Sequence, residues 1–228
     1  VFVLAGDRSV TAFDGATGQK LWSQQRPSDP LLLRQAGLLV PVGDTLLVGL
    51  GGRLTAMNPL NGQVRWESLV GSSRGTNEVE RLVDLVAGAS RMGNSLCVRA
   101  FQAAVACVDA QSGRIAWSRP SQGHQGLDGD AQLVFGVESD SKVQAWQRST
   151  GVPSWTQDSL RFRGLSWPLA SHQGVVVGDE QGWLHVLSKK DGQPLQQIAT
   201  DGSAITGQPV QVGPLWVVVT GAGGVFGI

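Results

Sequence analysis

The chain repeats one pattern five times, and this repeat constrains the fold more than any local motif. A short apolar run leads through an Asp, Asn or polar residue and a turn Gly toward a Trp, with identical internal spacing in residues 10–22 and 54–66. The five copies end at Trp22, Trp66, Trp117, Trp155 and, in place of a fifth Trp, Gln196. A repeat of this kind is one supersecondary unit that cannot bury its apolar face alone, so neighbouring copies must stack.

The period of the repeat identifies the unit. The turn glycines are Gly18, Gly62, Gly113, Gly151 and Gly192, at steps of 44, 51, 38 and 41 residues. These steps are typical of a propeller blade of four strands. Two further apolar runs lie between successive motifs, for example residues 38–42 and 46–49. We therefore predict an all-β fold, a β-propeller of four-stranded blades with about five and a half blades, in a single domain over residues 1–228.

Each part of the repeat has a physical reason. The apolar alternation is typical of a half-buried strand, and the Asp or Asn accepts backbone N–H groups where the chain turns. The Gly fits a turn position with positive φ. We expect the Trp ring to cover a small residue of the preceding strand and its indole N–H to bond between blades. Trp22, Trp66, Trp117 and Trp155 are thus predicted to dock the blades on one another.

Composition and charge exclude several classes of function. Lys and Arg number 18, as do Asp and Glu, so the basic surface that nucleic-acid binding requires is not expected. No apolar stretch approaches the roughly 18 residues of a membrane helix. Residues 1–4 already read as a strand, so we expect the domain to be incomplete at its N-terminus.

No residue set predicts catalysis, a metal or a cofactor. His124, His172 and His185 are scattered over separate repeats without the spacing of metal ligands. No Ser lies in a nucleophile elbow. The glycine-rich segments 49–52 and 221–224 lack the Lys-Ser/Thr of a phosphate loop and are interpreted as hairpin turns.

Cys97 and Cys107 flank a predicted hairpin whose tip is near Gln102. A two-residue turn would place the two thiols on opposite faces, whereas a shift of one residue would place them opposite each other. The sequence leaves this disulfide open, and such a bond requires an oxidising compartment.

The repeat resembles the Trp-docking repeat of the pyrroloquinoline-quinone type, which two families carry. Quinone-dependent dehydrogenases need a Ca²⁺ cage and a catalytic Asp, and we find no such constellation. The segments 31–34, 75–84 and 177–185 are instead similar to segments of the BamB family of outer-membrane assembly factors. One departure is Val86, where a second acidic residue after Asp84 is expected.

The resemblance implies a function and a location. The chain would be about the C-terminal two-thirds of an eight-bladed ring, part of a lipoprotein held at the periplasmic face of the outer membrane. It would be a non-enzymatic scaffold of the β-barrel assembly machinery that binds the periplasmic domains of the barrel-inserting subunit and assists outer-membrane protein folding. Unfolded outer-membrane clients are a further expected partner. The alternatives are a fragment of a quinone-dependent dehydrogenase and a protein-binding propeller of another pathway.

Leu31, Leu33, Arg34 and Asp84 form our predicted partner-binding patch. Three leucines before an Arg in a loop resemble a small hot spot with a charged anchor. Alternatively, Leu31 and Leu33 begin a strand and pack inward at period two. The resemblance to the BamB family favours the partner-facing interpretation.

Overall fold

The structure, a computed structural model, describes residues 1–25, 36–72 and 83–228. The regular elements of these residues are 22 β-strands in six antiparallel sheets, each made of strands consecutive in the chain. Four sheets have four strands and two have three. The described residues contain no helix with the length and apolarity needed to span a bilayer.

We call the six sheets blades 1 to 6, in chain order. Blade 1 contains β1 (Phe2–Leu4), β2 (Val10–Phe13) and β3 (Lys20–Gln24). Blade 2 contains β4 (Leu39–Val42), β5 (Thr45–Leu50), β6 (Arg53–Met57) and β7 (Val64–Leu69). Blade 3 contains β8 (Ser90–Met92), β9 (Ser95–Ala100), β10 (Ala104–Asp109) and β11 (Ile115–Pro120). Blade 4 contains β12 (Leu127–Gly129), β13 (Leu133–Val137), β14 (Val143–Gln147) and β15 (Pro153–Gln157). Blade 5 contains β16 (Leu169–Ala170), β17 (Val175–Gly178), β18 (Trp183–Leu187) and β19 (Pro194–Ala199). Blade 6 contains β20 (Val210–Val212), β21 (Leu215–Val219) and β22 (Val225–Gly227).

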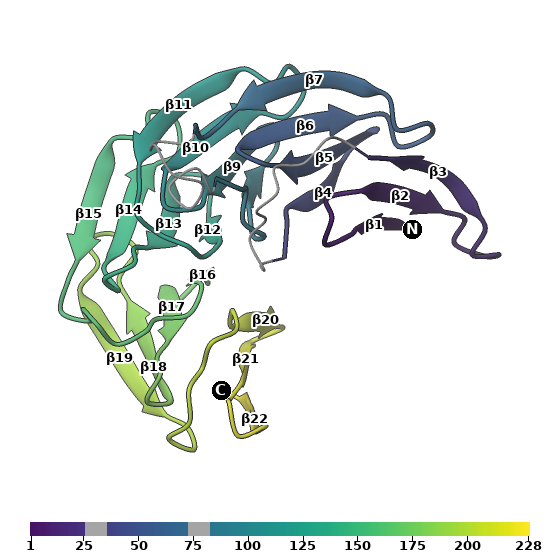
Figure 1. The fold of residues 1–228 in the computed structure, drawn as a ribbon. Coiled ribbons are helices and arrows are strands. Elements are labelled where there is room, and N and C mark those ends of the chain that lie inside the picture. The colour runs from purple at the N-terminus through teal and green to yellow at the C-terminus, as the bar shows by residue number, and fades with distance from the viewer. Residues whose placement is uncertain (26–35, 73–82) are drawn as a thin grey trace, which may run out of the picture.

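The blades follow one another around an arc, with β7, β11, β15 and β19 on its outer side (Figure 1). The N-terminus lies on the blade at one end of the arc and the C-terminus on the blade at the other end (Figure 1). This arrangement of four-stranded sheets confirms the predicted all-β propeller class, with strands for five and a half blades in the described residues.

The core lies between the blades. In the four-stranded blades the middle strands are mostly buried on both faces, as in β5 and β17, whereas the outer strands β7 and β19 are mostly exposed. Buried apolar side chains form clusters that each join neighbouring blades, such as Leu47 of blade 2 with Val98 of blade 3. A middle strand therefore reads as a continuous apolar run, because it packs against a blade on each side.

The turn before each outer strand has the predicted chemistry. The five turn glycines have φ between 68° and 76°, which confirms the positive φ expected for them. In blade 1 the Asp14 carboxylate accepts the backbone N–H groups of Ala16 and Thr17 at 3.0 and 2.7 Å. The carboxylate thus takes the place of backbone carbonyl acceptors for these two N–H groups in the turn.

The connections between blades pack against the hairpin turns that join the second and third strand of a full blade. The N–H of Phe101 donates to Asp84 O at 2.9 Å, and the N–H of Glu180 donates to Arg163 O at 3.1 Å. We call the side of the arc formed by these connections and turns the connection face.

Cys97 and Cys107 form a disulfide between β9 and β10. The hairpin turns through three residues, 101–103, with Gln102 at φ 47°. This register pairs Cys97 directly with Cys107, with the two Cα atoms 3.9 Å apart. The three-residue turn thus produces the alternative in which the two thiols face each other.

Candidate functional site

Three of the four residues of the predicted patch, Leu31, Leu33 and Arg34, lie outside the described residues, as does most of segment 75–84. Asp84 is described, and so are the residues that follow each segment along the chain. The site is therefore built from these flanking residues and from the blades that hold them.

The flanks of the two segments meet on the connection face. Ala36 and Gly37 follow the first segment, and Val86 and Ala87 follow the second. The N–H of Ala87 donates to Ala36 O at 3.0 Å, and Gly37 forms an isolated antiparallel bridge with Val86. The structure thus joins the C-terminal flanks of the two connections that the sequence singled out.

Asp84 is buried at this junction. Its carboxylate is paired with the Arg8 guanidinium, from the turn between β1 and β2, and both side chains are almost inaccessible to water. Burial raises the pKa of the Asp84 carboxyl group, and the Arg8 charge opposes this shift. The carboxylate points into the molecule and joins blade 1 to the connection between blades 2 and 3.

The sequence does not reveal the role of Arg8, which stands there as an ordinary turn residue. Its φ of +63° is uncommon for a side chain of this size. A basic residue at the tip of a short hairpin looks exposed in the sequence, and its partner is 76 residues away. No local pattern could have paired the two.

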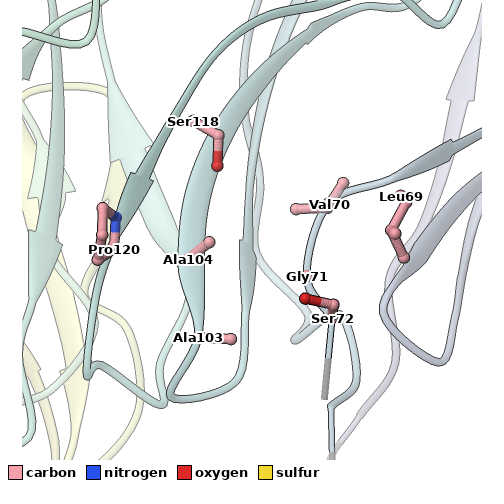
Figure 2. A pocket seen from close by; sticks show the side chains of 8 residues that line it. All are labelled: Leu69, Val70, Gly71, Ser72, Ala103, Ala104, Ser118 and Pro120. Carbon is pink, nitrogen blue, oxygen red and sulfur yellow. The ribbon is translucent and has the colours of Figure 1, made fainter. Parts of the chain in front are cut away.

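A groove of about 340 Å³ lies between blades 2 and 3, beside this junction. Figure 2 shows Leu69, Val70 and Ser72 on one side and Ala103, Ala104, Ser118 and Pro120 on the other. Small side chains line most of it, and none of the lining residues carries a charge. Its only signal in the sequence is the two small-residue pairs, Gly71-Ser72 and Ala103-Ala104, which the repeat pattern does not single out.

The four Trp residues of the repeat join each blade to the next. The indole N–H groups of Trp22, Trp66, Trp117 and Trp155 donate to the carbonyl oxygens of Pro59, Gln111, Arg148 and Lys189 at 2.9, 3.0, 2.7 and 2.7 Å. Each acceptor belongs to the turn before the outer strand of the following blade. The rings cover the glycines of those turns, so that a Cβ at Gly151 would overlap the Trp117 indole.

Charged side chains also join blades in the interior. Arg99 of β9 is fully buried and donates to Glu138 Oε1 of the blade 4 turn at 3.1 Å. Burial lowers the pKa of Arg99 to about 10, against the opposing effect of the Glu138 charge, so Arg99 stays protonated at neutral pH. In blade 5, Asp179 binds both Arg163 Nε at 2.7 Å and His185 Nε2 at 2.9 Å.

These clusters are interpreted as structural. The three histidines lie apart, with His172 near Gln211 and His185 on Asp179. Within the described part of the chain, no three His, Cys, Asp or Glu side chains gather as metal ligands would. The described residues therefore offer the connection face, made of loops and turns, as the candidate site.

A scan of protein families matches residues 1–157 to the family described as "Outer membrane protein assembly factor BamB". The chain belongs to this family. The match covers blades 1 to 4, which contain all four docking Trp residues and the junction of the two connections.

Relatives from several bacteria carry the same name. The BamB of Burkholderia pseudomallei (strain K96243) is 36% identical over 100% of this chain and 60% of its own length. That of Bordetella pertussis (strain Tohama I) is 34% identical over 98% of this chain and 58% of its own length. The chain thus spans about 60% of the length of these two curated relatives.

Solved structures support the BamB-like fold. The crystal structure of BamB from Moraxella catarrhalis superposes with a TM-score of 0.89 at 24% identity, over 99% of this chain and 68% of that one. A computationally designed protein, Ika8, superposes with a TM-score of 0.72 at 18% identity, over 97% of this chain and 65% of that one. At these identities the likeness concerns the fold alone.

Proposed function

We propose that this protein is a non-enzymatic scaffold of the outer-membrane β-barrel assembly machinery. It binds the periplasmic domains of the barrel-inserting subunit and thereby assists the folding and insertion of outer-membrane proteins. The observation that carries the proposal is the match of residues 1–157, and of relatives over the whole chain, to assembly factors of the BamB family.

The proposal includes a location and an architecture. The protein works at the periplasmic face of the outer membrane, held there by a lipid anchor in the intact protein. The Cys97–Cys107 disulfide supports this location, since such bonds persist in oxidising compartments. Residues 1–228 belong to one propeller domain whose complete ring has eight blades, and unfolded outer-membrane proteins are secondary partners.

The proposed binding patch consists of Leu31, Leu33 and Arg34, and Asp84 contributes to it indirectly. Two observations favour this part of the connection face: the flanks of both connections are paired, and the Asp84–Arg8 pair holds them on blade 1. Asp84 contributes by fixing the second connection, because its carboxylate is buried rather than offered to a partner.

The test is a binding titration between full-length protein and the periplasmic domains of the barrel-inserting subunit. We expect saturable binding that a Leu33→Ala/Arg34→Ala double variant weakens at least about 30-fold, the loss expected when a hot spot of about 2 kcal/mol is removed. Phe162→Ala is the matched control, because Phe162 is a 77% exposed apolar residue on another connection. It should leave the affinity within about twofold.

The other outcomes distinguish an error in the binding patch from an error in the proposed function. Binding that survives in the double variant would keep the function and discard the patch. An absence of binding by the wild type would discard the function in favour of another protein-binding propeller.

A further inference from the structure

The sulfur atoms of Cys97 and Cys107 lie at the interface between blades 3 and 4. The two residues are 0% and 1% exposed, and they share one cluster with Leu127, Val134 and Trp146 of blade 4. The disulfide is therefore enclosed by the blade that follows it in the chain.

Blade 4 also holds the disulfide directly. Arg148, in the turn after β14, donates from Nη1 to Cys97 Sγ at 3.3 Å and to Ser90 O at 3.2 Å. Its Nε donates to Asp130 O at 2.6 Å, which fixes the guanidinium on blade 4. On the other side of β10, Trp117 pairs with Cys107 and donates to Arg148 O.

This enclosure conflicts with the chemistry that forms the bond. Thiol–disulfide exchange requires a thiolate to approach a sulfur of the oxidant in a mixed-disulfide intermediate. An oxidant of peptide size cannot reach sulfurs that blade 4 covers. The β9–β10 hairpin, however, brings together two residues only ten apart in sequence, and closing so short a loop is fast and costs little entropy.

We propose that Cys97 and Cys107 are a substrate site for a disulfide-bearing oxidant, and that they are oxidised on the β9–β10 hairpin before blade 4 docks. The two thiols release two protons and two electrons as their S–S bond forms. The S–S bond of the oxidant takes them up and becomes two thiols. Docking of blade 4 then seals the bond against thiol reductants. This proposal is independent of the partner proposed above.

The first experiment measures oxidation before and after folding. Full-length protein is reduced in denaturant and given oxidised glutathione either at once or after the denaturant has been removed. Free thiols are trapped with an alkylating reagent and counted by mass spectrometry. We expect oxidation in the folded protein to be at least about 100-fold slower, because it must await opening of the blade interface. Equal rates would overturn the proposal.

The reverse reaction keeps the test valid if the reduced chain does not fold. The oxidised native protein is treated with dithiothreitol, with and without urea. Reduction should be slow in the native protein and rapid in urea. Equally fast reduction in both conditions would overturn the proposal.

A pair of variants tests whether Arg148 forms the seal. Arg148→Met removes the contact with Cys97, and we expect it to accelerate native reduction about tenfold. Arg119→Met is the matched control, because Arg119 joins the same two blades through Gly151 O at 2.9 Å and Thr150 O at 3.2 Å without touching sulfur. Equal acceleration in both variants, at matched stability, would overturn the role of Arg148.

Discussion

At the scale of single residues, the docking Trp requires a small partner beneath it. The residues opposite the four docking Trp in the register are Ala12, Ala56, Cys107 and Ala145. In blade 5, where Gln196 takes the place of Trp, the opposite residue is the branched Val186. The small residue and the Trp thus occur together in the register of blades 1 to 4. Cys107 fits this position and adds a covalent bond to it.

A second residue-scale feature is Asp179, whose carboxylate is buried in blade 5. Burial alone would raise its pKa, but hydrogen bonds from His185, the Trp183 N–H and Arg163 outweigh it and lower the pKa below its ordinary value. A carboxylate with a depressed pKa stabilises the folded state above its unfolded pKa of about 3.9. That contribution is lost as the pH falls through the folded pKa.

We predict that Asp179→Asn lowers the free energy of unfolding by about 1–3 kcal/mol at pH 7, because charged hydrogen bonds are lost. The difference from wild type should shrink as the pH falls below about 4 towards the lowered pKa of the folded state, because the carboxyl group of the unfolded wild-type chain is protonated first. Urea unfolding across this pH range measures both effects. Asp158→Asn, at an exposed carboxylate outside the cluster, should change the stability by less than about 0.5 kcal/mol. A pH-independent loss in Asp179→Asn would contradict this assignment.

At the scale of elements, the turn before each outer strand has two roles. Its Gly takes a positive φ, and in blades 2 to 5 the same Gly lies under the Trp ring of the preceding blade. Gly18 has the same φ region but open space around it. The two roles can therefore be measured separately.

We predict that Gly18→Ala costs about 1 kcal/mol of stability, the cost of a left-handed conformation for a residue with a Cβ. Gly151→Ala should cost about 1–3 kcal/mol more, because its Cβ overlaps the Trp117 indole and forces blades 3 and 4 apart. Thermal or urea unfolding of both variants makes the comparison. Equal losses of stability would show that the contact of the Trp117 indole with Gly151 adds nothing to the cost of the substitution.

The same elements show what the sequence can predict. Strand positions, turn glycines and the interblade place of Trp117 follow from the repeat, because these features are local or periodic. The three-residue turn at Gln102 and the pairing of Arg8 with Asp84 do not follow from it. The length of that turn decides between two strand registers that differ by one residue. The Arg8–Asp84 pair joins residues that are distant in the chain. An acidic residue in a connection is usually exposed, and the burial of Asp84 depends on that distant Arg.

At the scale of the whole molecule, the chain is a linear array of sheets. Each sheet is made of consecutive strands, and the clusters of the core join each blade to its neighbours along the chain. The free energy of unfolding is then roughly the sum of the stability of each blade and of each interface between neighbouring blades. A blade with a neighbour on both sides is stabilised by two such interfaces.

We predict that hydrogen exchange is slowest in β9, β13 and β17, which are buried strands of flanked blades. In a polypeptide of residues 1–228 alone, blades 1 and 6 each have one neighbour, so their strands should exchange faster by about 100-fold or more. Exchange measured by mass spectrometry on residues 1–228 resolves the blades. Uniform protection along the chain would indicate one cooperative unit instead.

The Trp contacts also have a direction. Each indole bonds to a carbonyl between 31 and 45 residues further along the chain, on the blade that follows. A polypeptide that emerges N-terminus first from a translocation channel can therefore complete each junction as soon as the next blade has emerged. Until then the newest blade shows its Trp to the surroundings, and each following blade covers the ring of the blade before it.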